Sequence, residues 1–492
     1  MEKPDNRGDP AALADSGGTR GAGWGGPAAA GAAGVVTAAV AAPVPFRRAA
    51  RVGNGDDEGT YVKRQRGKGR VMLAGAAAMC AVVALPGNAW AAGEPSPYAF
   101  DSGAKKIAGA AQTGDAPTIE AGSVYRDSIR GGEKRYYRMD LDAKANVYVS
   151  AVAVPRLKTT VKSSDNIKVT IQDGNAYNCS YDDADFGLSE FPRPIANNAL
   201  RGIGADKTDC QEAGSYYVVV ERKSEGTSSP DPWELEISPV TEPGLEPGST
   251  APPKAPESWP SQSPAPVGGG PKERAGGTGF FDAPGLESGE WKTRIEAGES
   301  LFYKVPVDWG QQLFVAAELG SSKSFDDARY VSGALDVEVF NPARGLVDDA
   351  STITYTGKQV TAAVDPMPPV AYENRTASPN NVSETRFAGW YYLRVALSPE
   401  VKRKFSDESL GLNLRINVTG KAKKGPAYDG DPGIFAVTSD DKEAAASGQS
   451  TAEQSDNGTM KLVAAAGIGA GTVLVLGLGV WTLLGRRRAL GG

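Results

Sequence analysis

The chain contains no histidine among its 492 residues and only three cysteines, so several kinds of chemistry are excluded at once. Without histidine there is no Ser-His-Asp or Cys-His catalytic arrangement, no imidazole ligand for a metal, and no ordinary general base near neutral pH. The cysteines, Cys80, Cys179 and Cys210, form no C-x-x-C pair. Zinc ribbons and thioredoxin-type redox chemistry are therefore unsupported as well.

The chain also lacks a strong excess of charge of either sign. Its 53 lysines and arginines against 59 aspartates and glutamates give a formal net charge of −6, and no basic stripe interrupts its middle. A surface that binds nucleic acid needs such a stripe, so we expect no nucleic-acid partner. The length leaves room for two or three domains of ordinary size.

Residues 62–91 have the three parts of a signal peptide in the usual order. Basic residues come first, an apolar run follows over residues 71–85, and Ala89, Trp90 and Ala91 form a small-x-small cleavage site. A buried core helix is the alternative interpretation. Residues 1–61 show no helix or strand periodicity, so we expect a disordered low-complexity extension or a mis-called start.

Residues 461–485 are expected to form a transmembrane helix. Residues 462–485 carry no charge, and at 1.5 Å per residue they suffice to span a hydrocarbon core of ~30 Å. Arginines at 486, 487 and 488 follow, which by the positive-inside rule places the basic tail, residues 486–492, in the cytoplasm. We therefore expect a single-pass type I protein of the plasma membrane with an extracellular ectodomain, and a disordered stalk over residues 421–460.

The predicted membrane helix also offers a contact for a second copy of the chain. Gly467 and Gly471 are spaced as a small-xxx-small pair, which lets two membrane helices approach closely and would form a homodimer. The alternative is that these glycines reflect the ordinary frequency of glycine in membrane helices. Outside the membrane we expect the partner to be a cell-wall polymer or a surface protein, whose identity the sequence does not give.

The part between signal and anchor contains one strand pattern twice. Residues 132–151 and 298–317 agree at an offset of 166, and later strands agree at offsets that grow only between strands. Tyr137 and Met139 share one face of a predicted strand, as do Tyr303 and Val305, whereas charged neighbours such as Lys304 take the other face. A one-residue slip would turn the apolar set outward, so each copy is expected to be one antiparallel β domain.

A stretch dense in proline, serine and glycine separates the copies, and such composition favours extended, solvated chain. We therefore expect an all-β fold: two antiparallel jelly-roll-like β-sandwiches over residues 98–240 and 278–420, joined by a linker over residues 241–277, plus one C-terminal transmembrane helix. The linker is expected to let the two sandwiches move independently.

Short motifs in both copies resemble the bacterial pre-peptidase C-terminal (PPC) domain. The matching residues in the second copy are Gly298, Glu299, Phe302, Tyr303, Val337, Val339, Asn341, Pro342, Gly345, Gly389, Tyr391 and Tyr392. The resemblance implies a jelly-roll-like β-sandwich of the kind attached to many secreted enzymes and surface proteins. The assembly as a whole also resembles actinobacterial membrane-anchored proteins. The chain has no D-x-S-x-S motif, so the metal-adhesion domain of some of those proteins is not expected.

Cys179 and Cys210 are expected in the long loops of the first copy and have no equivalents in the second. Outside the cell an unpaired thiol would be exposed to oxidation, and these two are the only partners available. The sequence therefore predicts a Cys179–Cys210 disulfide that pins an insertion. A bridge closing ~30 residues is worth about 3–4 kcal/mol in the chain-entropy model.

The densest acidic cluster holds Asp182, Asp183 and Asp185. Oxygen ligands on an extracellular β loop suit calcium, which makes these residues a calcium-site hypothesis. The alternative is a solvated turn, and we expect no other cofactor. Paired carboxylates that hydrolyse glycosides remain conceivable without histidine, but no pair stands out.

Four aromatic residues, Trp291, Trp309, Trp390 and Phe314, would either form a carbohydrate platform or fill the core. Exposed, adjacent indoles at Trp309 and Trp390 would favour the platform, and buried ones would favour a scaffold. We expect a non-catalytic cell-surface binding or scaffolding protein. The alternative is a carbohydrate-binding or carboxylate-dependent glycan-processing surface enzyme.

Overall fold

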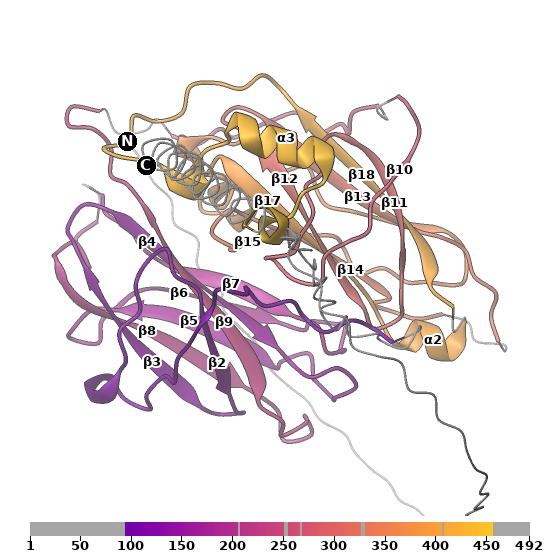
Figure 1. Cartoon of the computed structure of the whole chain (residues 1–492), viewed down its shortest axis with the longest axis horizontal. Coiled ribbons are helices and arrows are strands. Elements are labelled where there is room, and N and C mark those ends of the chain that lie inside the picture. The colour runs from indigo at the N-terminus through magenta and orange to yellow at the C-terminus, as the bar shows by residue number, and fades with distance from the viewer. Residues whose placement is uncertain are drawn as a thin grey trace, which may run out of the picture. The chain divides into compact units, whose positions relative to one another are not determined.

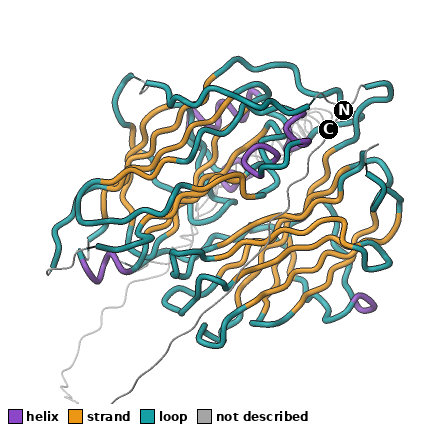
Figure 2. Tube along the Cα trace, turned by 180° about the vertical axis from the view of Figure 1, so that it is seen from behind, coloured by secondary structure: helices purple, strands orange, loops and turns teal. Residues whose placement is uncertain are grey.

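A computed structural model of the chain describes residues 94–455, apart from residues 205–206, 250–253, 266–267, 326–329 and 406–407. The described residues all belong to one compact unit. They are mainly strands and loops, with a few short helices (Figure 2). The expected all-β architecture is confirmed for this part of the chain.

The first half forms two sheets whose inner faces share one apolar core (Figure 1). One sheet has the order β1 (Lys105–Lys106), β2 (Tyr125–Ile129), β9 (Trp233–Glu242), β4 (Asn146–Val154), β7 (Ile195–Arg201). The other has the order β3 (Lys134–Leu141), β8 (Gly214–Lys223), β5 (Asn166–Gln172), β6 (Asn178–Asp185). The neighbouring strands are antiparallel except for the short edge pair of β1 and β2. A single-turn helix, η1 (Thr113–Asp115), precedes β2.

The second half repeats this arrangement around a second core. One sheet has the order β10 (Lys272–Glu273), β11 (Gly289–Ile295), β18 (Leu410–Thr419), β13 (Gln312–Leu319), β16 (Val360–Ala363). The other has the order β12 (Ser300–Val307), β17 (Gly389–Leu397), β14 (Leu335–Phe340), β15 (Leu346–Asp349). Short helices occupy the connections and the end of this half: η2 (Tyr372–Thr376), α1 (Asn380–Ser383), α2 (Glu400–Lys404), η3 (Gly433–Phe435) and α3 (Ser439–Ser447).

The two sandwiches agree in detail as well as in strand order. In both, the edge strand is parallel to its neighbour, and in both the hairpin of β5–β6 or β14–β15 carries a register shift at the same place. Tyr137 and Tyr303 are each fully buried on equivalent strands, as the alternation predicts. The duplicated sequence pattern therefore corresponds to a duplicated sandwich.

The predicted linker over residues 241–277 needs correction at both ends. Strand β9 continues to Glu242, and β10 lies at Lys272–Glu273, where it pairs with β11. Between them, Trp259 Nε1 donates a hydrogen bond of 2.6 Å to the carbonyl oxygen of Pro366. The composition predicted a solvated chain. In the described part of this segment, however, individual side chains such as Trp259 bind it to the second sandwich.

The predicted disordered stalk over residues 421–460 is wrong for its described part. Helix α3 begins with a capping box made by Thr438 and Asp441, and Phe435, Ala444 and Ala445 are buried. This segment covers the outer face of β12, so that Lys304 is 1% exposed instead of solvated. The burial of one aromatic and two alanine side chains is enough to hold this segment on the sandwich, although few of its residues are apolar.

The predicted signal peptide (62–91), transmembrane helix (461–485) and cytoplasmic tail (486–492) lie outside the described residues, as does the glycine pair at 467 and 471. Within residues 94–455, apart from the gaps given above, no helix is long and apolar enough to cross a membrane. The membrane topology stays a prediction.

Candidate functional site: the interface between the sandwiches and an aromatic groove

A buried carboxylate, Glu242 at the end of β9, joins the two sandwiches. Within the first sandwich it accepts hydrogen bonds from Asn146 Nδ2 at 2.8 Å and Tyr148 OH at 3.0 Å. From the second half it accepts one from Arg375 Nη2 and one from Tyr428 OH, both at 2.7 Å. Burial alone would raise the pKa of Glu242, but the attraction of Arg375 and the hydrogen bonds outweigh it, so the pKa is below its usual value. Glu242 is therefore a structural anion.

A second buried carboxylate, Glu236, repeats this design on the same strand. It accepts a hydrogen bond from Tyr98 OH at 3.2 Å and one from the backbone N–H of Asp101 at 3.0 Å. It also forms an ion pair with Arg344 of the second sandwich. Burial tends to lower the pKa of Arg344, but the adjacent Glu236 raises it overall. These three partners enclose Glu236, whose side chain is 0% exposed.

A third cluster crosses the interface with four titratable groups. Arg193 of the first sandwich pairs with Asp336 at 3.0 Å, and Arg394 pairs with both Asp336 and Glu338, the latter at 2.6 Å. Arg394 also donates to the carbonyl oxygen of Pro194. Burial raises the pKa of Glu338 to about 7, with Asp336 adding repulsion, while the two arginines keep the pKa of Asp336 low. The interface thus encloses titratable side chains that the sequence analysis assigned to separate domains.

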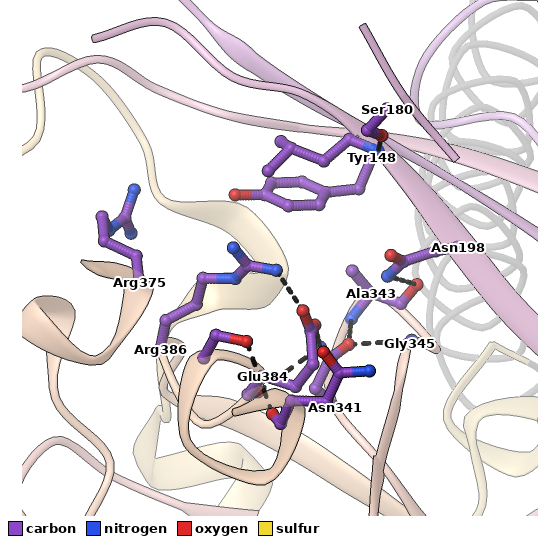
Figure 3. Close-up of polar contacts among 12 residues, drawn as sticks. Tyr148, Ser180, Asn198, Asn341, Ala343, Gly345, Arg375, Glu384 and Arg386 are labelled. Atoms are coloured by element: carbon purple, nitrogen blue, oxygen red, sulfur yellow. Dashed lines mark hydrogen bonds and ion pairs between the residues drawn. The ribbon is translucent and has the colours of Figure 1, made fainter. Parts of the chain in front are cut away.

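The Asn341–Gly345 turn, which carries the PPC-like motif, lies in this interface (Figure 3). Asn341 Oδ1 accepts hydrogen bonds from the backbone N–H groups of Ala343 and Gly345 at 2.9 and 3.0 Å. Asn198 Nδ2, from β7, donates to the carbonyl oxygen of Ala343 at 3.1 Å. A Cβ on Gly345 would lie 2.6 Å from Asn198 Nδ2, so a larger residue here would displace the Asn198 side chain from this contact. The turn positions the contact between the sandwiches.

Glu384 extends the same network (Figure 3). It accepts a hydrogen bond of 2.7 Å from Asn341 Nδ2 and forms an ion pair with Arg386, whose guanidinium lies 5.6 Å from the ring centre of Tyr148. The negative charge of Glu384 also acts on Asp182 of the first sandwich. The bonds to Glu384 therefore come from the second sandwich, and its effect on the first is electrostatic.

The three calcium candidates do not converge. Asp182, Asp183 and Asp185 lie on strand β6, not in a loop or turn, because β6 pairs along its length with β5. Successive side chains of a strand point to opposite faces, so Asp182 is separated from the other two. Burial, with the charge of Glu384 adding to it, raises the pKa of Asp182 to about 6. In the described part of the chain no group of three or more His, Cys, Asp or Glu side chains is arranged to hold a metal ion.

The predicted disulfide is confirmed. Cys179 and Cys210 are bonded across a sequence separation of 31 residues. Cys210 lies in the segment before β8, but Cys179 lies on strand β6 and not in a loop, because that stretch pairs with β5. Both cysteines pack at the margin of the first core. Arg201 Nε donates a hydrogen bond of 2.7 Å to the carbonyl oxygen of Cys210, which ties the segment to β7. The bridge thus connects β6 to the segment that precedes β8.

The four aromatic residues do not form the exposed platform that was one of the two alternatives. Trp291, Trp309 and Phe314 are 1%, 8% and 7% exposed. Trp390 is half-buried, and its Nε1 donates to Asp441 Oδ1 of α3 at 2.8 Å. Their burial favours the scaffold.

A different aromatic surface exists where the chain before β10 crosses the second sandwich. A groove of about 720 Å³ is lined by Trp259, Trp309 and Tyr372, together with Lys423 and Lys424. Sequence reasoning missed it because Trp259 stands alone in a proline-rich stretch. The only carboxylate among its described lining residues is Glu373, whereas glycoside hydrolysis ordinarily needs a pair.

No protein-family model matches the chain, and no curated protein matches it either. Solved structures that match include the pre-peptidase C-terminal domain of a collagenase from Bacillus anthracis, with 14% identity over 25% of this chain and 94% of that chain, at a TM-score of 0.16. The N-terminal CBM22-1–CBM22-2 tandem domain of Paenibacillus barcinonensis Xyn10C is 12% identical over 61% of this chain and 92% of that chain, at 0.17. The ANX1 ectodomain from Arabidopsis thaliana is 12% identical over 62% and 86%, at 0.17. With TM-scores below 0.5, these similarities assign neither function nor partner.

Proposed function

We propose that the chain is a non-catalytic binding or scaffolding protein of the bacterial cell surface, held in the plasma membrane by residues 461–485 with both sandwiches outside. The PPC-like motifs and the resemblance to actinobacterial membrane-anchored proteins support this assignment. In this account the partner is a cell-wall polymer or a surface protein, and the two sandwiches present their surfaces to it as one body.

The observation that carries the proposal is that the buried carboxylates at the interface are enclosed and paired with arginines. Glu236 and Glu242 are each 0% exposed and each paired with an arginine of the other sandwich. A catalytic acid or base has to reach a substrate proton within hydrogen-bond distance, which these enclosed groups do not. Their arrangement favours a fixed relation between two sandwiches, which suits a scaffold.

Location is tested in cells that express the full-length chain. Surface biotinylation should label lysines of the ectodomain, and alkaline carbonate extraction should leave the chain in the membrane pellet. A chain protected from the biotin reagent in intact cells would contradict the proposed location.

The enzyme alternative is tested on the purified full-length chain with isolated cell-wall glycan. We expect no release of reducing sugar. Release that is lost on Glu373→Gln, the carboxylate in the groove, and kept on Asp183→Asn, a solvent-facing carboxylate of β6, would make the glycan-processing enzyme the better account.

A further inference from the structure

Specific hydrogen bonds fix the walls of the groove beside Trp259. Three hydrogen bonds fasten residues 255–260 to the second sandwich: from Ala255 N to Thr376 Oγ1 at 3.2 Å, from Trp259 Nε1 to Pro366 O at 2.6 Å, and from Gln312 Nε2 to Pro260 O at 2.7 Å. The bond from its Nε1 fixes the orientation of the Trp259 indole. On the other side, Lys423 N donates to Trp309 O at 2.8 Å. The groove walls are thus held in place by specific bonds on both sides.

Trp309 contributes an unused donor to this groove. Its side chain is 8% exposed, and the hydrogen bonds that Trp309 makes to described residues run through its backbone N–H and carbonyl, not through its indole Nε1. A Cβ on Gly425 would lie 2.3 Å from that nitrogen, so the glycine backbone lies directly against the indole. Trp309 Nε1 is not among the enclosed partnerless polar atoms of the described residues, and Trp309 lines the groove, so an acceptor that enters the groove can reach this donor.

Two lysine side chains give the groove its charge. Lys423 and Lys424 are exposed, and neither has an ion-pair partner in the described part of the chain. Lys254, a further lining residue, is paired with Glu257. Glu373 is the only opposing charge on the described lining, so the groove has a net positive character although the whole chain has a net charge of −6.

From these groups we infer that the groove binds an acidic glycan, a chain of sugar rings that carry carboxylate or phosphate. The Trp259 ring offers an apolar face to a sugar ring, the Trp309 N–H offers a donor to a sugar or acid oxygen, and Lys423 and Lys424 attract the anion. Nucleic acid also combines rings with phosphates, but two lysines on a chain of net negative charge give no track for a polyanionic backbone. The inference rests on the proposed function and names the class of its ligand.

The test uses the purified full-length chain and four immobilised polymers. Polygalacturonate carries carboxylates and its methyl ester does not; phosphomannan carries phosphates and mannan does not. We expect binding to at least one charged polymer, at least tenfold weaker binding to its neutral counterpart, and weakening as sodium chloride is raised, because exposed charges are screened. Binding to polygalacturonate would identify the anion as a carboxylate, and binding to phosphomannan would identify it as a phosphate.

Variants tie the binding to the groove. Lys423→Gln with Lys424→Gln should weaken it roughly fivefold to tenfold, as expected for two exposed charges. Lys421→Gln, in the same segment but outside the groove, is the matched control and should leave binding unchanged. Trp259→Ala should abolish measurable binding, and Trp259→Phe, which keeps a ring, should retain part of it; the unfolding midpoint of each variant is measured alongside.

Several outcomes overturn the inference: no binding to either charged polymer, equal binding to the neutral counterparts, tighter binding to a single-stranded DNA oligonucleotide, or an unchanged affinity in the double lysine variant. These measurements do not depend on where the chain resides. A chain that binds the glycan but is not at the cell surface therefore contradicts the proposed function alone.

Discussion

Glu242 and Arg375 form an ion pair of 2.7 Å although they lie 133 residues apart and belong to different sandwiches. The glutamate side chain is 0% exposed and the arginine 17% exposed. Burying a charge costs free energy that only a partner and hydrogen bonds offset, so the pair stabilises one particular contact between the two halves.

Removing the arginine should be costly. Arg375→Met leaves the Glu242 charge buried without its cation and is expected to lower the free energy of unfolding by about 3 kcal/mol, measured by denaturant titration. Adding Glu242→Gln to Arg375→Met should recover part of this loss, because no uncompensated charge remains. Arg138→Met removes an exposed pair with Asp140 and should cost under about 1 kcal/mol. Equal costs for the two arginine variants would argue against the buried pair as a determinant of the interface.

The disulfide should contribute as a chain crosslink. In a Cys80→Ala background, a thiol reagent should find no free thiol before reduction and two after it. Cys179→Ser with Cys210→Ser should lower the free energy of unfolding by about 3–4 kcal/mol, as a loop of this length predicts. Two reactive thiols in the unreduced chain would refute the bond.

Asp182 should make stability depend on pH. Burial raises its pKa to about 6, above an unfolded value near 4, so the folded state binds the proton more tightly. This contribution to stability is fully present below about pH 4 and is lost as the pH rises through about 6. Asp182→Asn should therefore raise the thermal midpoint relative to wild type at pH 8 but not at pH 4. Asp183→Asn, on the exposed face of the same strand, is the control; an identical pH profile for Asp182→Asn and wild type would contradict the assignment.

Calcium should not affect the folded chain, because β6 divides Asp182 from Asp183 and Asp185. Thermal unfolding of the purified chain should give the same midpoint with EDTA and with millimolar calcium chloride. A rise with calcium that disappears in Asp183→Asn would reinstate the calcium site.

The sequence predicted those features that rest on local pattern. Alternation identified the core positions of Tyr137 and Tyr303, and the compartment argument paired Cys179 with Cys210. The Asn341–Gly345 turn was recognised as a motif, though not as an interface contact.

The interface itself could not be read from the sequence. Glu236 and Glu242 occupy strand positions at which charge ordinarily signals a solvent-facing side chain, and their burial depends on a second sandwich lying against them. The same reasoning failed for Lys304, whose face of β12 is covered by the segment containing α3. When a distant segment buries one face of a strand, the strand's own alternation of apolar and polar residues does not reveal it.

The central claim is that the two sandwiches form one folded unit. Hydrogen exchange of the full-length chain, followed by mass spectrometry at increasing denaturant, measures this most directly. It uses peptides from β4 and β13, which are interior strands paired on both sides, one in each sandwich. The account predicts one common unfolding midpoint for both strands, shifted equally by Arg375→Met. Two separate midpoints, with β4 unaffected by that substitution, would show that the sandwiches are independent and would contradict it.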